Sequence, residues 1–298
     1  MPRRDSLLPV PYSLCPMHVW IGTSGYSYPD WVGQFYPPGT RASGMLAHYC
    51  RHFPLVELNF TFYRPPTAAM LTRIARHTPA GFQFLVKLPR LLSHERQLAA
   101  LAPFQESVAA LHQRGRLLGL LCQLPQAAHH DRPSQAWLET LARGLAPYRL
   151  CVEFRHCSWD RPDVAPWLEE RGVELVSVDA PDLPTLYPSG LVRAGDRLYI
   201  RLHSRTAANW YQSDKDRYDF NYTDPMLREW ITALREASGN VGHALVLFNN
   251  CHRAQAAANA QRLRELLERY APELSIVQPF TAPSDEPQQR LLFGDPIQ

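Results

Sequence analysis

The chain has 298 residues, of which 45% are hydrophobic and 20% are charged, and its formal net charge at neutral pH is +3. This composition is ordinary for a globular protein and supplies enough apolar mass for a large core. So small a net charge does not by itself indicate nucleic-acid binding, and the most apolar stretch, Leu117 to Leu124, is too short to cross a bilayer.

The chain begins with residues 1–17, which we expect to form an N-terminal arm. This arm carries two arginines and several prolines, with no continuous apolar run or small-residue cleavage site, so no secretory signal is predicted. Among the six cysteines no Cys-x-x-Cys pair occurs, which predicts reduced thiols in a cytoplasmic protein rather than disulfides or a zinc or iron–sulfur site.

Eight short apolar runs then follow, each about the length of a β-strand. They are nearly continuous in hydrophobicity instead of alternating with polar residues, as strands are when both faces of a parallel sheet are covered. The predicted strands are His18–Gly22, Leu55–Asn59, Phe82–Lys87, Leu118–Gln123, Arg149–Phe154, Val173–Val178, Arg197–Leu202 and Ala244–Asn249.

Segments with the pattern of α-helices separate most of these strands. Ser134 and Asp224 are plausible N-caps, and Pro225 suits a first helical position. The proline-rich stretch 179–196 is expected to be an irregular crossover, and 204–222 a long loop over one end of the fold. The predicted helices are Arg41–His52, Thr67–His77, Gln97–Arg114, Ser134–Leu145, Asp163–Arg171, Asp224–Ala237 and Arg253–Tyr270.

This alternation predicts an α/β fold, namely a single (β/α)8 barrel of the TIM type over residues 18–280, followed by a C-terminal tail at 281–298. An open, doubly wound sheet is the alternative. In a barrel the functional residues gather at the carboxyl ends of the strands, so we read those ends in chain order.

Every strand after the first ends in a polar or charged residue. Side chains two positions apart on a strand point to the same side of the sheet. Three strand ends carry such a pair: Glu57 with Asn59, Glu153 with Arg155, and Arg201 with His203. The remaining candidates are Tyr63 after the second strand, Lys87, His94, Gln123, His156, Asp179, Asn249 and Asn250. A single charged residue at a strand end is often merely solvated, but the uniformity of the ends favours a common pocket.

The chemical types at these ends predict a site for an anion. Lysine and arginine side chains clamp phosphate or carboxylate groups, and a carboxylate or a histidine can then move a proton. We therefore assign catalytic roles to Glu57, Glu153, Asp179 and His203. The substrate-binding set is Asn59, Tyr63, Lys87, His94, Gln123, Arg155, His156, Arg201, Asn249 and Asn250.

Two further interpretations of these residues stay open. Glu57, Glu153, Asp179 and His203 are also compatible with a divalent metal, although no ligand spacing indicates one and pairing with the arginines explains the carboxylates equally well. The segment 22–25, Gly-Thr-Ser-Gly, is compatible with wrapping an anion, but a tight turn is the simpler reading. The sequence identifies no cofactor and leaves the oligomeric state unknown.

Several motifs, in order along the chain, resemble one known family. They are GTSGYSYPDW from Gly22, VELNFTFY from Val56, FLVK ending at Lys87, VEFRH from Val152, YIRLH from Tyr199 and FNN from Phe248. Over roughly residues 18–270 the chain is similar to the YecE-like family, domain-of-unknown-function family 72. The resemblance implies a TIM barrel, but it implies no reaction.

Three classes of function compete for this set of residues. The first is an enzyme, a hydrolase, lyase or isomerase, that acts on a small or polymeric anionic substrate bearing phosphate or carboxylate at the carboxyl end of the barrel. The second is a non-catalytic binding module for a nucleotide or other phosphorylated ligand. The third is a metal-dependent, nuclease-like hydrolase, and the near-neutral charge makes nucleic acid the less favoured partner. No membrane partner is expected.

Overall fold

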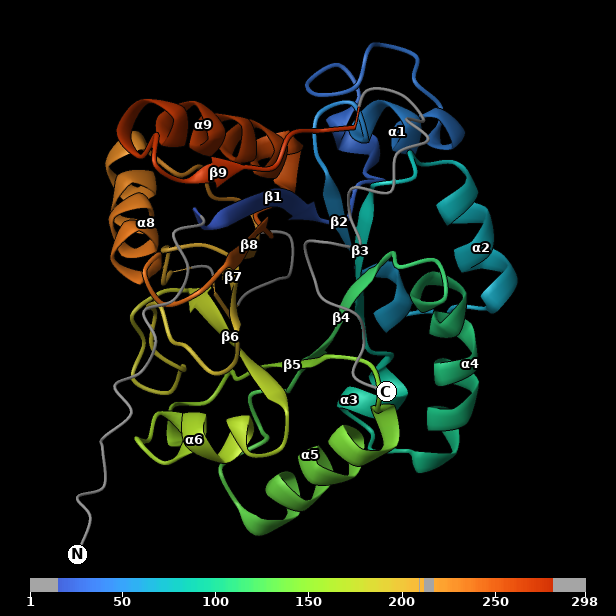
Figure 1. Ribbon diagram of the computed structural model, residues 1–298, viewed down its shortest axis with the longest axis vertical. Helices are drawn as coiled ribbons and strands as arrows, with labels where there is room; N and C mark the ends of the chain where they lie inside the picture. The colour runs from blue at the N-terminus through green and yellow to red at the C-terminus, as the bar shows by residue number, and fades with distance from the viewer. Residues whose placement is uncertain (1–15, 209, 212–216, 281–298) are drawn as a thin grey trace, which may run out of the picture.

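A computed structural model describes residues 16–208, 210–211 and 217–280. Within these residues eight parallel strands close into a barrel, with helices around its outside (Figure 1). The sheet runs from β2 through β8 to β1, and β1 also pairs with β2, which closes the ring. The strands are β1 (His18–Ser24), β2 (Leu55–Leu58), β3 (Gln83–Lys87), β4 (Leu117–Gln123), β5 (Leu150–Glu153), β6 (Val173–Asp179), β7 (Arg197–Leu202) and β8 (His243–Phe248).

The helices cover the outer face of the barrel and leave one connection irregular. Among the described residues no helix joins β6 to β7, and the stretch 180–196 is instead pinned by two isolated bridges, His156 with Leu186 and Val178 with Gly190. The helices are α1 (Ala42–Tyr49), α2 (Ala68–Arg76), α3 (Arg90–Ser93), α4 (Leu101–His112), α5 (Arg132–Leu145), α6 (Val164–Glu169), α8 (Asp224–Ala237) and α9 (Gln255–Tyr270).

The predicted barrel is confirmed, and each predicted strand and helix is found within a few residues of its expected bounds. Two predicted caps are wrong by one to three positions. The cap of α5 is Asp131, whose carboxylate accepts the backbone N–H of Ser134 at 2.8 Å, and the cap of α8 is Thr223. Either a carboxylate or a hydroxyl satisfies the free N–H groups of a first helical turn, so the sequence offers neighbouring candidates.

Apolar side chains form two separate layers on either side of the strands. One cluster fills the inside of the barrel and includes Trp20, Leu85, Val176, Tyr199 and Leu245, all nearly or fully buried. The larger cluster lies between the strands and the surrounding helices. The inner cluster ends below the carboxyl ends of the strands, where polar residues take its place.

A short ninth strand, β9 (Ser275–Ile276), completes the opposite, amino-terminal end of the barrel. It pairs in parallel with His18 and Val19 at the start of β1, whereas β2 pairs with Gly22 to Ser24 at the end of β1. Val277 and Phe280 pack against the inner cluster, and Gly81 makes room for the Phe280 ring, since a Cβ there would lie 2.4 Å from it. This element is not among the predicted strands, because two residues are too few to show a hydrophobic periodicity.

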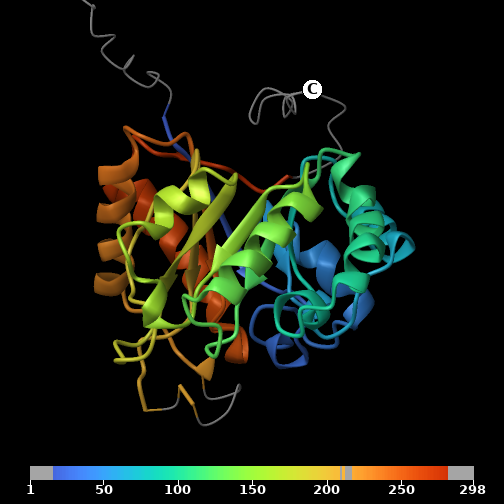
Figure 2. The same cartoon turned by 90° about the horizontal axis from the view of Figure 1, so that it is seen from below.

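The side view in Figure 2 separates the two ends of the barrel. The described chain enters at one end, and the loops that follow the strands gather at the other. The predicted arms, 1–15 and 281–298, fall outside the described residues, as do 209 and 212–216 of the predicted loop. No described helix has the length and apolar character needed to cross a membrane.

Candidate functional site

The polar strand ends meet inside the carboxyl end of the barrel, around one arginine. Arg201 on β7 has no exposed surface and donates hydrogen bonds with all three guanidinium nitrogens. Its Nε and Nη2 bind Glu57 on β2 at 2.8 and 2.7 Å, its Nη1 binds Glu153 on β5, and Nη2 also reaches Ser24 Oγ at 3.3 Å. One side chain thus joins four strands across the barrel.

Glu57 is held on both of its oxygens. Oε1 accepts from Arg201, and Oε2 accepts from Arg201 and from the hydroxyl of Tyr199. Burial and the neighbouring carboxylate raise the pKa of Tyr199 well above its usual value, so it stays a donor. A carboxylate bound in this way, with no exposed surface, supports its neighbours and is poorly placed to take a proton from a substrate.

Glu153 links Arg201 to a second arginine and a histidine. Its Oε1 lies 2.6 Å from Nε of Arg155 and 3.4 Å from Nε2 of His203. Burial opposes its ionisation, but Arg155 and Arg201 outweigh burial and hold the pKa of Glu153 well below its usual range. We refer to Glu57, Glu153, Arg155 and Arg201 as the buried ion network; its two carboxylates and two guanidiniums balance in charge.

His203 is neutral in this environment. Burial and the neighbouring Arg155 lower its pKa to about 3, despite the attraction of Glu153. Its Nδ1 lies 2.9 Å from Nδ2 of Asn249, an amide donor, which fits a ring whose proton is on Nε2 and faces Glu153. The predicted role of a charged acid therefore does not suit His203 near neutral pH.

Lys87 occupies the end of β3, beside the buried ion network. Its ammonium donates to Oε1 of Gln123 at 2.8 Å and lies 4.7 Å from the centre of the Phe62 ring, and the residue is 9% exposed. No carboxylate in the described chain forms an ion pair with it. Burial, followed by the nearby Arg201, lowers the pKa of Lys87 to about 7, so near neutral pH both its amine and its ammonium are populated.

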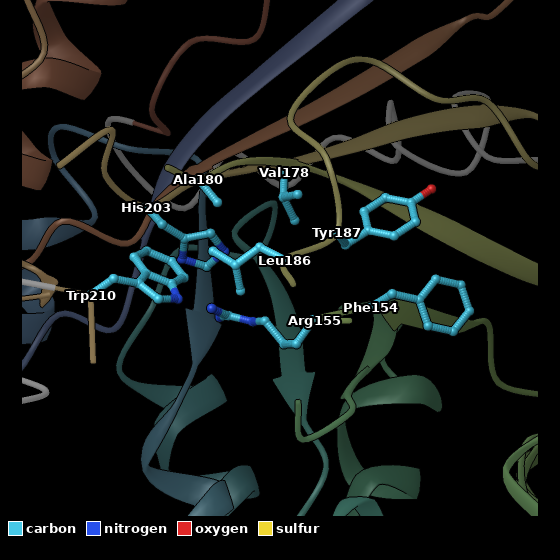
Figure 3. Close-up of a pocket in the computed structure, with 8 residues that line it drawn as sticks. All are labelled: Phe154, Arg155, Val178, Ala180, Leu186, Tyr187, His203 and Trp210. Carbon is cyan, nitrogen blue, oxygen red and sulfur yellow. The ribbon is translucent and has the colours of Figure 1, made fainter. Parts of the chain in front are cut away.

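Arg155 presents the other cation of the open end. Figure 3 shows its side chain extending from the end of β5 toward His203 and Trp210, with its guanidinium 5.5 Å from the indole. Only its Nε is paired, and within the described residues neither terminal nitrogen makes a hydrogen bond. These residues border a small hollow, which Leu186 and Ala180 also line.

Asp179 does not face this site, so its predicted place in the pocket is wrong. It lies one residue beyond Val178, which points to the hollow, and strand alternation turns Asp179 to the helix side. There its carboxylate accepts from Nε1 of Trp230 on α8 at 2.6 Å and from two nitrogens of Arg205 at 2.8–3.0 Å. These bonds fasten α8 and the β7–α8 segment to the barrel.

Replacing Asp179 by alanine is therefore expected to destabilise the fold without removing a site group. Loss of the carboxylate leaves the buried Trp230 N–H without an acceptor, which costs about 1–2 kcal/mol in unfolding free energy. Asp179→Asn keeps an oxygen for Trp230 and should lose less. Urea unfolding measures both, and an Asp179→Ala protein as stable as the wild type would contradict the assignment.

The remaining predicted residues divide between the open end and other surroundings. Gln123 and His94 are partly exposed near Lys87, with His94 packed edge-on against Phe62. Asn59 is also partly exposed, and its amide donates to Asn249 Oδ1 at 3.4 Å. Tyr63 lies on the rim, 79% exposed. Asn250 instead turns away and binds Asn259 and the Phe220 carbonyl, and His156 stacks on His129 outside the strand ends.

The segment from Gly22 to Gly25 is the end of β1 and a turn. Gly25 has φ +90°, and a Cβ there would lie 2.4 Å from the Tyr28 hydroxyl, so only glycine fits. The N–H of Thr23 donates to Tyr49 Oη at 2.9 Å and that of Gly25 to the Glu57 carbonyl at 2.8 Å. Because these N–H groups already have acceptors, the segment is a tight turn, and its backbone is not arranged to wrap an anion.

Two residues of the site, Tyr199 and Trp210, lie outside the predicted set of site residues. Tyr199 belongs to the alternating series with Arg201 and His203, and that spacing was signal enough to place it on the same face. Trp210 lies in the 204–222 segment, where no periodic pattern could place it over Arg155. Within the described residues no group of three or more His, Cys, Asp or Glu side chains is arranged to hold a metal ion, and Glu57 and Glu153 bind guanidiniums instead.

Comparison with known proteins gives a consistent picture. A family model described as "Protein of unknown function DUF72" matches residues 20–285. The UPF0759 protein YunF of Bacillus subtilis is 26% identical over 270 residues, which cover 84% of this chain and 95% of that protein. A solved DUF72 family protein of Thermotoga maritima is 35% identical with a TM-score of 0.78, covering 84% of this chain and 99% of that one. A solved DUF72 family protein of Enterococcus faecalis, at 22% identity and a TM-score of 0.75, shares the fold.

Proposed function

The chain belongs to the DUF72 family of proteins of unknown function, and from that premise we propose that it is an enzyme acting on a small anionic substrate, with Arg155 binding the anion and Lys87 exchanging the proton. The substrate carries a carboxylate or a phosphate and enters at the carboxyl end of the barrel. Glu57, Glu153 and Arg201 act as positioning residues beneath it.

One observation carries the proposal: the open end of the barrel holds two cationic groups with donors to spare. The terminal nitrogens of Arg155 form the planar fork that binds carboxylate and phosphate in a two-point contact. The Lys87 ammonium has three protons, of which one is used on Gln123. Both residues are 9% exposed, so an incoming anion meets them with little water between.

Charge balance also favours an anion over a cation or a neutral molecule. The buried ion network is neutral as a set, so a protonated Lys87 adds one uncompensated positive charge beside it. A bound monoanion would offset that charge and stabilise the ammonium. We therefore expect anion binding to be accompanied by proton uptake at Lys87 above about pH 7.

Arg155→Met tests the binding role. The substitution keeps much of the side chain's apolar stem and removes the fork, so affinity for phosphate and for pyruvate should fall about 10- to 100-fold, the value of a charge-assisted hydrogen bond. Isothermal titration calorimetry on the folded proteins gives both dissociation constants. Repeating the wild-type titration in buffers of different ionisation enthalpy measures the proton uptake.

Arg161→Met is the matched control for this experiment. Arg161 forms an exposed ion pair with Asp163, apart from the strand ends, and its loss should leave both affinities unchanged. The proposal fails if the wild type binds neither anion at millimolar concentration, or if Arg155→Met binds them as tightly as the wild type does.

A further inference from the structure

We propose that Lys87 acts as a covalent catalyst, whose amine forms an imine with the carbonyl carbon of a small oxo acid or oxo phosphate held by Arg155. This inference rests on the proposed function, because it needs the anion at Arg155, and it narrows the role of Lys87 from proton exchange to bond formation. The substrate class is an anion that carries a ketone or aldehyde near its charged group.

Lysine is rare in this chain, which makes the lysine at the end of β3 distinctive. The chain has 31 lysine and arginine residues, and only two of them, Lys87 and Lys215, are lysines. Arginine thus supplies nearly every positive charge in this protein, including Arg155 and Arg201 within the site. If the end of β3 needed only a permanent cation to bind an anion, arginine would serve there as well. A primary amine differs from a guanidinium in that it can lose its proton and attack a carbon atom.

The surroundings of the Lys87 amine are dry and favour its uncharged form. The stem of Lys87 is buried, its nitrogen lies over the face of Phe62, and its single hydrogen-bond partner is the amide oxygen of Gln123. Arg201 and, more weakly, Arg155 act on it as positive charges; Glu57 and Glu153 act in the opposite direction, but neither forms an ion pair with it in the described structure, and burial with Arg201 outweighs them. Desolvation beside other cations is one of the known ways in which proteins make a lysine nucleophilic.

The neighbouring carboxylates and histidines cannot form an imine in place of Lys87. Glu57 and Glu153 are bound by Arg201, burial keeps the pKa of His203 near 3 and that of His94 near 4, and both rings are uncharged at neutral pH. A neutral imidazole has a lone pair, but it lacks the two N–H protons that must leave when an imine forms. With its pKa lowered to about 7, Lys87 supplies a primary amine that is partly unprotonated under physiological conditions.

The step balances without an external reagent. The lone pair of the neutral amine attacks the carbonyl carbon, a C–N bond forms, and the C–O π electrons move to oxygen. The two amine protons then leave with that oxygen as water, which gives C=N. Arg155 is near enough to act on Lys87 as a positive charge, so an oxo acid bound to Arg155 through its carboxylate can direct its carbonyl to the amine, which would raise the effective concentration of the two reacting atoms.

Reductive trapping on the full chain tests the inference. The protein is incubated with pyruvate or glyoxylate, reduced with borohydride, digested with trypsin and analysed by mass spectrometry. We expect one reduced adduct on Lys87, in a peptide that trypsin no longer cuts there, at a level at least tenfold above that on Lys215 and the N-terminal amine. Its rate of formation should rise with pH around 7, whereas an ordinary lysine reacts with a midpoint near 10.5.

The small number of lysines gives sharp controls. Lys215→Arg should keep the adduct, and Lys87→Arg and Lys87→Met should lose it. Because site mapping is done on the wild type, a variant that fails to fold does not decide the outcome. Adducts spread equally over both lysines and the terminus, or absent while calorimetry shows pyruvate binding that depends on Arg155, would overturn the imine and leave the anion site standing. Absence of binding would instead overturn the proposed function itself.

Discussion

Arg201→Met is expected to lower the free energy of unfolding by about 3–5 kcal/mol, the cost of leaving buried charges without their partner. Glu57 and Glu153 have no exposed surface, and Arg201 binds three of their four oxygens. Methionine fills much of the volume but supplies no donor. The two carboxylates would then either stay charged in a dry environment or take up protons, and both cost stability.

Denaturant unfolding with a matched surface variant measures this effect. Arg161→Met removes an ion pair in which both side chains are more than half exposed, and it should cost less than about 1 kcal/mol. Adding Glu57→Gln to Arg201→Met removes the carboxylate that has lost its cation and should recover part of the loss, whereas Glu153 keeps Arg155 as a partner. An Arg201→Met protein within 1 kcal/mol of the wild type would show that the network contributes little.

The second large effect is a rise in stability with pH that depends on Lys87. Its pKa is lowered from 10.5 to about 7 in the folded chain, so between these values the unfolded chain holds a proton that the folded chain does not. Stability therefore increases with pH across this window, by up to about 1.4 kcal/mol per pH unit, and from pH 7 to 9 the gain is about 2–3 kcal/mol. Well below pH 7 Lys87 is protonated in both the folded and the unfolded chain, so it no longer makes stability depend on pH.

The difference between wild type and Lys87→Met isolates this contribution. Buried thiols such as Cys122, whose pKa burial raises to about 12, act in the opposite direction as the pH approaches 9, but they are common to both proteins. Lys215→Arg should follow the wild-type profile. Parallel profiles for wild type and Lys87→Met, measured by urea unfolding at pH 7, 8 and 9, would mean that Lys87 keeps an ordinary pKa.

The fold was largely predictable because its signals are long and regular. Each of the eight buried parallel strands corresponds to an apolar run in the sequence. The bounds of α8 and β7 are those that the sequence predicts. The elements that were missed are too short to carry a period, as β9 and α3 are. The caps were displaced because Asp131 and Ser134, or Thr223 and Asp224, are similar in their local chemistry.

The site was predictable at the level of which residues lie inside, and less so at the level of what each one does. Because side chains alternate between the two faces of a strand, the sequence predicts that Glu57, Glu153, Arg155 and Arg201 lie together, and in the structure they do. It could not tell that Arg201 would be saturated by carboxylates while Arg155 kept two nitrogens unpaired. Those properties depend on distances between strands that are far apart in sequence.

The side chain direction of Asp179 could not be predicted from its position at a strand end. The sequence places a carboxylate at the end of β6, but its side depends on the register of that strand, and one residue of shift reverses it. The register is set by pairing with β5 and β7, which brings Val178 opposite Arg201 and turns Asp179 to Trp230. A long-range contact therefore decides whether this carboxylate serves the site or the scaffold.

The small strand β9 has a consequence for the order in which the protein can be made. The first two residues of β1, His18 and Val19, pair with β8 on one side and with Ser275 and Ile276 on the other. During synthesis the ribosome makes β1 before the other described strands and helices and β9 after them, so that edge of β1 stays open until Ser275 and Ile276 have left the ribosome. We therefore expect a nascent chain stopped before Ser275 to expose an unpaired strand edge together with the apolar floor that Val277 and Phe280 cover, and to depend on chaperones until release.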